Sequence, residues 1–330
     1  MEKKCWYKEM AVYQIWCRSF CDGNGDGIGD LWGVLSKLDY IASLNVDGIW
    51  FSPLYPSPNA DYGYDISDYK NIHPDFGNLE VFKQVLDGAH ERGLRVFMDL
   101  VVNHSSDEHE WFRKACEDPD GPYGQYFYIR PWHEGEKLPN NWRSYFGGSV
   151  WEKLPGHDDR IYLHLFHKKQ PDLNWENPKV RQGVYDMMRF WLDKGVDGFR
   201  MDVINFISKE PGLPDGPREP GALYGDFTPH AVNGPRVHEF LKEMNREVLA
   251  RYDGYIQKQR EEVARARRLE DLALPDDLDY AAMHGLRLEA RQKLAATRPH
   301  SVGQAARISG VSPADVSVLL IELKRREERA

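Results

Sequence analysis

Arg200 and Asp202 are the pair of residues whose types and spacing best suit covalent chemistry in this sequence. They end a short apolar run, and a guanidinium beside a carboxylate favours the ionised form of that carboxylate. The ionised form is the one that a carboxylate nucleophile requires. Taken alone, an Arg-x-Asp pair is more often a structural ion pair, so its meaning depends on the residues that accompany it.

Two other segments carry polar side chains in comparable places. Asp99 and His104 flank the end of a second apolar run, and the loop after a third run contains Asp61 and Tyr64. Aspartate, histidine and tyrosine side chains form hydrogen bonds with hydroxyl groups, including those of sugars. Together the three segments predict a site in which a nucleophilic carboxylate lies beside a bound sugar.

Four short apolar runs are expected to form the strands that position these residues. Amphipathic helices are predicted between or after them, and this repetition of strand and helix is typical of a parallel α/β fold. Where parallel strands and helices of this kind form a barrel, functional groups gather at the carboxyl ends of the strands. The polar residues above occur at such ends. The predicted strands are Val12–Trp16, Val46–Ser52, Arg95–Val101 and Gly198–Val203, and the predicted helices are Leu31–Leu44, Leu79–Arg92, a segment that begins at Pro178, and Pro235–Ala250.

A long insert, about residues 104–174, separates the third predicted strand from the fourth. It is rich in Trp, Gly, Pro and Tyr, which favours a small subdomain lying over the site. The sequence thus predicts an incomplete (β/α)8 (TIM) barrel of about four strands with an inserted subdomain, followed by a small all-α domain.

The composition changes sharply near residue 253. All 10 Trp and all 14 Phe lie before Tyr252, and the net charge is −11 up to residue 253 and +2 after it. One folded unit rarely partitions its aromatic residues in this way, so the boundary is placed at 252–254, with domains at 1–252 and 253–330.

Composition also excludes several classes of protein. The overall net charge of −9 argues against a general binder of polyanions, and no apolar stretch is long enough to span a membrane. Met1–Trp16 has no apolar core typical of a signal peptide. The four cysteines lack zinc-site spacing, which favours reduced thiols and a cytoplasmic location.

In combination and in this order, the motifs resemble glycoside hydrolase family 13, the α-amylase superfamily. The resemblance extends from about Trp6 to Tyr252 and is strongest to the branch of oligo-1,6-glucosidases and α-glucosidases. It implies retaining hydrolysis of α-glucosidic bonds in oligosaccharides. The motifs that carry it are Gly48–Pro53, Asp99–His104, Gln170–Asn174 and Gly198–Asp202.

The resemblance also implies individual roles. Asp202 is the expected nucleophile, and Arg200 is expected to position it. A valine directly after the nucleophile, here Val203, goes with a preference for α-1,6 over α-1,4 linkages in this branch. The remaining expected contacts are to the nonreducing glucose, from Asp61, Tyr64 and His104, and to the next sugar, from Phe166 and Gln170.

A loop near the amino terminus has the spacing of a calcium site. It offers oxygen ligands on alternate residues, although a glycine stands where an EF-hand has its bidentate glutamate. The alternative is a turn rich in Asp, Asn and Gly. Because the family has a calcium site in this loop, we favour a structural calcium ion held by Asp22, Asn24, Asp26, Ile28 and Asp30.

The catalytic acid of the family is missing from its expected place. A retaining glycosidase needs a second carboxyl group as acid/base. In this family that group is a glutamate ending the fifth strand in a Gly-Glu pair, but the chain continues Asp253-Gly-Tyr-Ile-Gln without it. We therefore expect no useful glucosidase activity. We also expect the open edges of a four-stranded sheet to promote self-association.

Residues 254–330 are predicted to be helical, with a charged helix over Gly254–Asp271 and caps at Ser301 and Ser312. One stretch mimics a helix-turn-helix, but its second helix, Pro313–Ile321, lacks basic and amide groups on its exposed face, so DNA binding is rejected. About 254–326 resembles the C-terminal helical domain of the FAD-dependent tRNA wobble-uridine carboxymethylaminomethylation enzyme, glucose-inhibited division protein A. The motifs that carry this resemblance are Gly254–Gln259, Arg267–Glu270, Pro275–Tyr280, Arg298-Pro299 and Gly303–Pro313.

That resemblance implies docking to a GTPase partner of tRNA modification and help in holding tRNA. FAD binds far upstream in that family, and no Gly-x-Gly-x-x-Gly follows a strand here, so no FAD is expected. Three hypotheses follow: a glucosidase that works as a fragment or by complementation, a non-catalytic binding protein, or a chimera of two unrelated gene ends. The abrupt change at 252–254 without a linker favours the chimera.

Overall fold

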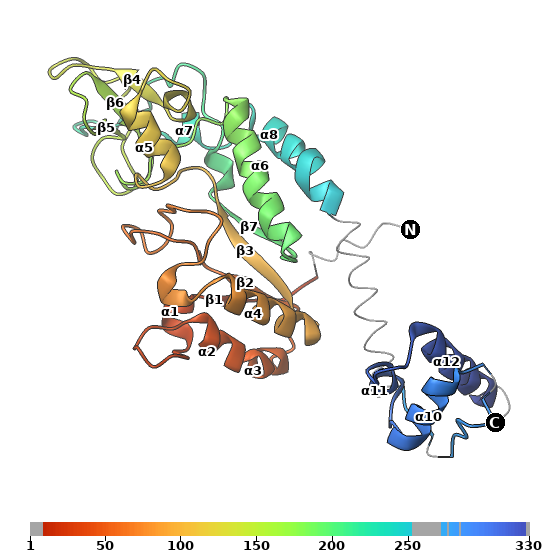
Figure 1. Cartoon of the computed structure of the whole chain (residues 1–330). Helices are drawn as coiled ribbons and strands as arrows, with labels where there is room; N and C mark the ends of the chain where they lie inside the picture. Colours follow the sequence, from red (N-terminus) through yellow and green to blue (C-terminus); the bar gives the residue numbers. More distant parts are fainter. Residues whose placement is uncertain (1–8, 253–271, 276, 284, 328–330) are drawn as a thin grey trace. The chain divides into compact units, whose positions relative to one another are not determined.

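The computed structural model describes residues 9–252, 272–275, 277–283 and 285–327. The chain divides into two compact units, Met1–Tyr252 and Asp253–Ala330, and each is described by itself (Figure 1).

A parallel four-stranded sheet in the order β1-β2-β3-β7 lies at the centre of the first unit (Figure 1). The parallel α/β fold predicted from the sequence is therefore confirmed. Strand β3 has the predicted bounds, while the other three strands are one to three residues shorter than predicted. The strands are β1 (Val12–Ile15), β2 (Gly48–Phe51), β3 (Arg95–Val101) and β7 (Gly198–Asp202).

Helices pack on one face of this sheet, because alternate residues of each strand point to the same side. Ile15, Ile49 and Met98 are fully buried in a core shared with the helices. Gly93 and Gly195 follow two of these helices with φ of +76° and +101°, a conformation that ends a helix and favours glycine. The helices are α2 (Leu31–Ser36), α3 (Leu38–Ser43), α4 (Leu79–Glu91) and α6 (Pro178–Asp193).

Two predicted helices differ from the observed ones. The helix predicted over Leu31–Leu44 is broken at Lys37, whose amide donates to the carbonyl of Val34 at 2.9 Å and so tightens the turn. The helix predicted over Pro235–Ala250 is α8 (Val237–Met244), which continues as a π-helical turn, Asn245–Leu249. Short helices elsewhere in this unit are α1 (Cys17–Phe20), α7 (Thr228–Ala231) and the 3₁₀ turns Pro74–Phe76, Gly124–Tyr126 and Ile204–Phe206.

The insert between β3 and β7 folds around an antiparallel sheet of its own, in the order β4-β6-β5 (Figure 1). Trp142, fully buried, packs there with Phe206 and Phe227, which come from the loop after β7. The insert is therefore joined by its core to the segment that follows Asp202. Its elements are α5 (Glu110–Glu117), β4 (Ile129–Pro131), β5 (Trp151–Lys153) and β6 (Arg160–Leu163).

The described part of the second unit contains three helices, α10 (Leu288–Thr297), α11 (Val302–Ala306) and α12 (Pro313–Glu327). Ser301 caps α11 by accepting a hydrogen bond from the amide of Gln304 at 3.1 Å. On α12, Val316, Leu319 and Leu323 are buried, whereas Leu320 is half-buried. The charged helix predicted over Gly254–Asp271 lies outside the described residues. None of the helices in the described ranges is long and apolar enough to cross a membrane.

Candidate active site

One guanidinium joins two carboxylates at the carboxyl end of the sheet. Strand pairing places Asp99 opposite Arg200 and Val101 opposite Asp202. Nη1 of Arg200 lies 3.2 Å from both carboxylate oxygens of Asp99 and also donates to Asp202. The guanidinium lies over the ring of Trp50, 4.9 Å from its centroid. Arg200 is therefore held from three sides.

Asp99 is fully buried, and its protonation differs from that of an ordinary aspartate. Burial raises the pKa of its carboxyl to about 7, and the charge of Arg200 only partly counteracts this effect. The indole of Trp50 donates to Asp99 at 3.2 Å and the hydroxyl of Tyr64 does so at 3.4 Å. Tyr64 therefore contacts Asp99, the buried partner of Arg200, from the loop after β2.

A chain of polar contacts runs beside this cluster. Nε2 of Gln170, from the segment after the insert's sheet, donates to the carboxylate of Asp61 at 2.9 Å and lies 3.1 Å from Nε2 of His104. The same His104 nitrogen lies 3.2 Å from the backbone carbonyl of Tyr64. Gln170 is fully buried and contacts Asp61 and His104, two of the residues expected at the nonreducing glucose.

The charge of Asp202 acts on both Asp61 and His104. Burial raises the pKa of Asp61, and the charge of Asp202 raises it further. Burial lowers the pKa of His104, although nearby carboxylates, Asp202 among them, act in the opposite direction. The structure thus brings the three predicted sugar-binding residues and the predicted nucleophile into one electrostatic neighbourhood.

Aromatic rings border the same region. The ring of Phe166 lies 5.2 Å from that of His104 and stacks on Tyr145 at 5.1 Å. Tyr145 is exposed and also lines a hollow of about 590 Å³ together with Arg143, Arg218 and Phe227. An exposed ring at the mouth of a polar site offers a flat apolar surface for a second sugar.

Val203, directly after the predicted nucleophile, has a strained backbone. Its φ is +36° and its ψ is +36°, in the left-handed region that β-branched residues rarely adopt. Strained residues of this kind persist only where their surroundings hold them, and they cluster at functional sites. Here the side chain of Val203 packs against the core around Phe206.

A buried lysine near the site was not predicted from the sequence. Nζ of Lys209 lies 2.9 Å from the carboxylate of Asp172 and donates to the side-chain carbonyl of Asn103 at 3.3 Å. Asn103 in turn donates to Asp172 at 3.0 Å and lies next to His104. Asp172 and Asn103 belong to motifs that the sequence displays. The position of Lys209 depends on how the loop after β7 folds back, and no local sequence pattern predicts that.

The oxygen-rich loop is closed by its own amides. The carboxylate of Asp22 accepts from the amides of Gly25 and Gly27 at 2.6 and 2.8 Å. Asp30 is buried, and its two carboxylate oxygens accept three amides of the loop and of helix α2. Across the described residues, no group of three or more His, Cys, Asp or Glu side chains is arranged to hold a metal ion. Carboxylates alone would therefore not hold an ion here. It would also need the side-chain oxygen of Asn24 and the backbone carbonyl of Ile28 as ligands.

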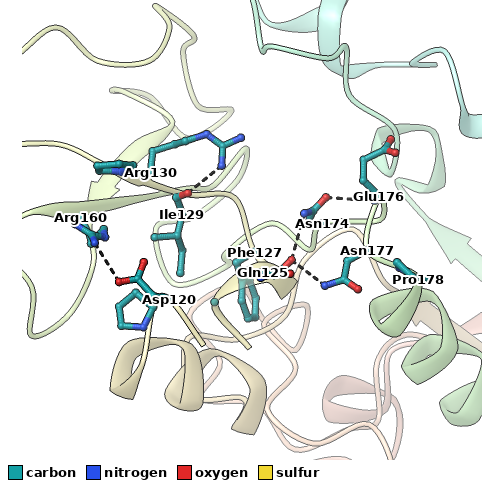
Figure 2. Close-up of a pocket in the computed structure, with 13 residues that line it drawn as sticks. Asp120, Gln125, Phe127, Ile129, Arg130, Arg160, Asn174, Glu176, Asn177 and Pro178 are labelled. Atoms are coloured by element: carbon teal, nitrogen blue, oxygen red, sulfur yellow. Dashed lines mark hydrogen bonds and ion pairs between the residues drawn. The ribbon is translucent and has the colours of Figure 1, made fainter. Parts of the chain in front are cut away.

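Another hollow, of about 520 Å³, lies between the insert and the amino end of α6 (Figure 2). Asn174 and Asn177 both donate to the carbonyl of Gln125 at 3.2 Å, and Arg160 pairs with Asp120 at 3.3 Å. These lining residues are engaged with one another. None of the residues predicted to act on a substrate is among those that line this hollow.

The fold places the chain in the class of parallel α/β proteins, with polar side chains gathered at the carboxyl ends of the strands. Residues 14–265 match the family model described as alpha amylase, catalytic domain. The chain belongs to the α-amylase family. Residues 262–330 match a second model, described as tRNA modifying enzyme MnmG/GidA C-terminal helical bundle. Both family resemblances seen in the sequence are therefore confirmed, and the chain joins segments of two families.

Relatives of the first unit include an oligo-1,6-glucosidase and a trehalose-6-phosphate hydrolase. The chain is 58% identical over 253 residues to the oligo-1,6-glucosidase of Parageobacillus thermoglucosidasius, covering 76% of this chain and 44% of that protein. It is 50% identical over 252 residues to the trehalose-6-phosphate hydrolase of Bacillus subtilis (strain 168), again covering 76% and 44%. The chain thus spans less than half the length of these curated relatives.

A solved structure shows the same likeness. The crystal structure of Bacillus licheniformis trehalose-6-phosphate hydrolase superposes with a TM-score of 0.71 at 49% identity, covering 75% of this chain and 43% of that one. The first unit is therefore similar in fold, as well as in sequence, to part of a family member.

Proposed function

We propose that residues 9–252 form the first half of a (β/α)8 barrel that binds a nonreducing α-glucosyl unit and does not hydrolyse it. Three observations support this proposal. They are the parallel order β1-β2-β3-β7, the similarity to proteins of which the matched region is less than half, and the polar site at the strand ends. Four strands are half of the eight that close such a barrel.

The observation that carries the proposal is the contact of Gln170 with both Asp61 and His104 beside the Arg200–Asp202 pair. A half-buried carboxylate beside a buried amide and a buried imidazole presents donors and acceptors for several adjacent hydroxyls. Binding of one glucose then requires only the residues of this half.

The proposed lack of hydrolysis rests on the second carboxyl group. Retaining glycosidases hold two carboxyl groups about 5–5.5 Å apart, and acid/base assistance contributes roughly 10²–10⁴-fold. Two glutamates that follow β7 have other partners. Glu210 lies 2.5 Å from Nδ1 of His230, and Glu247 pairs with Arg246 and Arg251 at 3.0 and 3.1 Å.

Calorimetry with isomaltose tests binding, and release of p-nitrophenol from its α-glucoside tests hydrolysis. We expect weak binding that Asp61→Asn and Gln170→Ala abolish, with no turnover above the uncatalysed rate. Gln182→Ala serves as the matched control, because Gln182 lies on the exposed surface of α6, where it binds Asp186. Turnover that disappears in Asp202→Ala would refute the lack of hydrolysis, and equal heats for all three variants would refute the site.

For linkage preference we propose α-1,6 over α-1,4. The support is Val203, whose backbone is held in a strained conformation directly after Asp202, and the similarity to oligo-1,6-glucosidases. Isomaltose is then expected to bind more tightly than maltose in the same calorimeter. Equal affinities would contradict this preference.

We also propose a structural calcium ion in the loop from Asp22 to Asp30. Its support is the alternation of oxygen-bearing residues, with Asp22, Asn24 and Asp26 all exposed to solvent. The ion would replace hydrogen bonds that the loop now makes internally, so its effect is expected on stability rather than on the shape of the loop.

A second candidate function belongs to the second unit, because residues 262–330 match a bundle from a tRNA modifying enzyme. We propose that this unit docks the GTPase partner of that modification, or tRNA. Immobilised full-length chain is expected to retain the purified GTPase, while Ile321→Lys, an exposed change on α12, weakens retention. Absence of retention by the wild-type chain would refute GTPase docking, and a gel-shift assay with tRNA tests the other partner.

A further inference from the structure

The face of the sheet opposite the described helices α2, α3, α4 and α6 carries aromatic residues. Strand pairing places Gln14, Trp50 and Phe97 side by side on one face, with Gly198 next in the row. Trp50 is half-buried and contacts Arg200 and Asp99 on this face, and Phe97 lies beside it, also half-buried. Val12 lies on this same face of β1, and 42% of its surface is exposed.

Both edges of the sheet are open to a further strand in the described part of the chain, since β1 and β7 each have one neighbour there. The carbonyls of Ala11 and Ile15 accept from the amides of Asp47 and Ser52 on the β2 side at 2.8 and 3.0 Å. Alternate residues of a parallel strand bond to opposite neighbours, so the backbone groups of Val12 and Gln14 point to the open edge. An open edge of this kind pairs readily with another strand.

We propose that two copies of this chain associate through this face and these edges to close one eight-stranded barrel. A twofold axis along the barrel would place β7 of each copy beside β1 of the other and keep all strands parallel. Such an interface is self-complementary and leaves no edge over, because each copy supplies four of eight strands. Trp50 and Phe97 of both copies would then fill the barrel interior. The inference rests on the half-barrel proposed above and is independent of glucoside binding.

Closure by a second copy does not supply the missing acid. The strand beside each β7 would be β1 of the partner, which ends at Ile15 and is followed by Trp16. Neither residue carries a proton for a leaving group, so the dimer is expected to remain without hydrolysis. A failure of dimerisation and a failure of glucoside binding are therefore separate results.

Sedimentation velocity on the full 330-residue chain tests the proposal. We expect a dimer, and Val12→Lys is expected to raise its dissociation constant by about tenfold or more, because it adds a charge to the barrel interior at the seam. Gln14→Lys is the second variant, in case the first folds poorly, and circular dichroism checks the fold of both. Tyr40→Lys is the matched control: Tyr40 is 53% exposed on α3, on the opposite side of the sheet from Val12.

Three results would overturn the proposal. A wild-type chain that stays monomeric at tens of micromolar, a concentration at which weak interfaces form, contradicts it. Open-ended aggregates that neither lysine variant disperses show that the edges pair without closure. A dimer that Ile321→Lys dissociates, while Val12→Lys leaves it intact, assigns the contact to the second unit.

Discussion

At the scale of single residues, the electrostatics of the site depend on the two carboxylates that share the guanidinium of Arg200. It contacts the fully buried Asp99 and the less buried Asp202 with the same Nη1 atom. Burial outweighs this contact at Asp99 and raises its pKa to about 7, so that side chain keeps its proton to a higher pH than an ordinary aspartate does. A neutral Asp99 leaves more of the guanidinium's charge for Asp202.

Replacing Asp99 by asparagine is predicted to change how stability depends on pH. An acid whose pKa is raised on folding binds its proton more tightly in the native state, so wild-type stability should fall as pH rises from about 4 to 7. Between pH 5 and pH 8 this loss amounts to about 2–3 kcal/mol. Asp99→Asn should lack this dependence.

Urea unfolding of the wild type and Asp99→Asn at both pH values measures this difference. Asp87→Asn, which changes an exposed carboxylate on α4, is the control and should behave like the wild type. Parallel pH dependence for wild type and Asp99→Asn would show that Asp99 titrates normally.

At the scale of elements, one buried carboxylate organises the helices of the second unit. Asp315, on α12, accepts from the amide and hydroxyl of Ser312 at 2.8 and 2.6 Å. It also accepts from the amide and guanidinium of Arg287, just before α10, at 3.1 and 2.7 Å. Arg287 holds the pKa of Asp315 well below its usual range. The carboxylate thus caps one helix and fixes the start of another.

Asp315→Ala is predicted to destabilise the second unit by about 2–4 kcal/mol, because several donors lose their acceptor at once. Since the pKa of Asp315 is lowered on folding, its contribution is present at neutral pH and is lost as pH falls below about 4. Hydrogen exchange of the amides of α10 and α12 measures the effect. Asp277→Ala is the control: it removes a pair with Arg326 in which the aspartate is 75% exposed, and should cost under about 1 kcal/mol.

The loop from Asp22 to Asp30 allows a direct test of the proposed calcium ion. Bound calcium stabilises only the folded chain, so adding it should raise the melting temperature of the first unit and a chelator should reverse the rise. Asp26→Ala, which removes an exposed carboxylate of this loop, should abolish the response. A melting temperature that is the same with calcium and with chelator would refute the ion.

At the scale of the whole molecule, the chain is two units with separate cores. The first buries aromatic residues such as Trp142, Trp175 and Trp191, while the core of the second consists mainly of leucine, valine and alanine around Tyr280. The family matches meet at residues 262–265, and the structure divides after Tyr252. Units with their own cores fold and unfold largely on their own account.

Calorimetry is therefore predicted to record two unfolding transitions. Only the transition of the first unit should be accompanied by a change in tryptophan fluorescence, because all ten tryptophans precede Tyr252. Asp315→Ala should move one transition and Asp99→Asn the other. A single transition that both substitutions shift would show that the two units unfold as one.

Local patterns in the sequence determined much of this protein. Apolar runs located all four strands of the main sheet, and the order of motifs identified both families. The capping residue Ser301 marked where a helix begins, because a cap needs only its own neighbours in the chain.

Tertiary structure alone decided how distant groups meet. It buried Lys209 against Asp172, turned the hydroxyl of Tyr64 toward Asp99, and placed Gln170 on Asp61. These contacts join residues far apart in sequence, and their energies depend on burial that no local pattern encodes. Asp202 was recognisable from its motif, but its nearness to Asp61 and His104 follows from the packing of the strands and their loops.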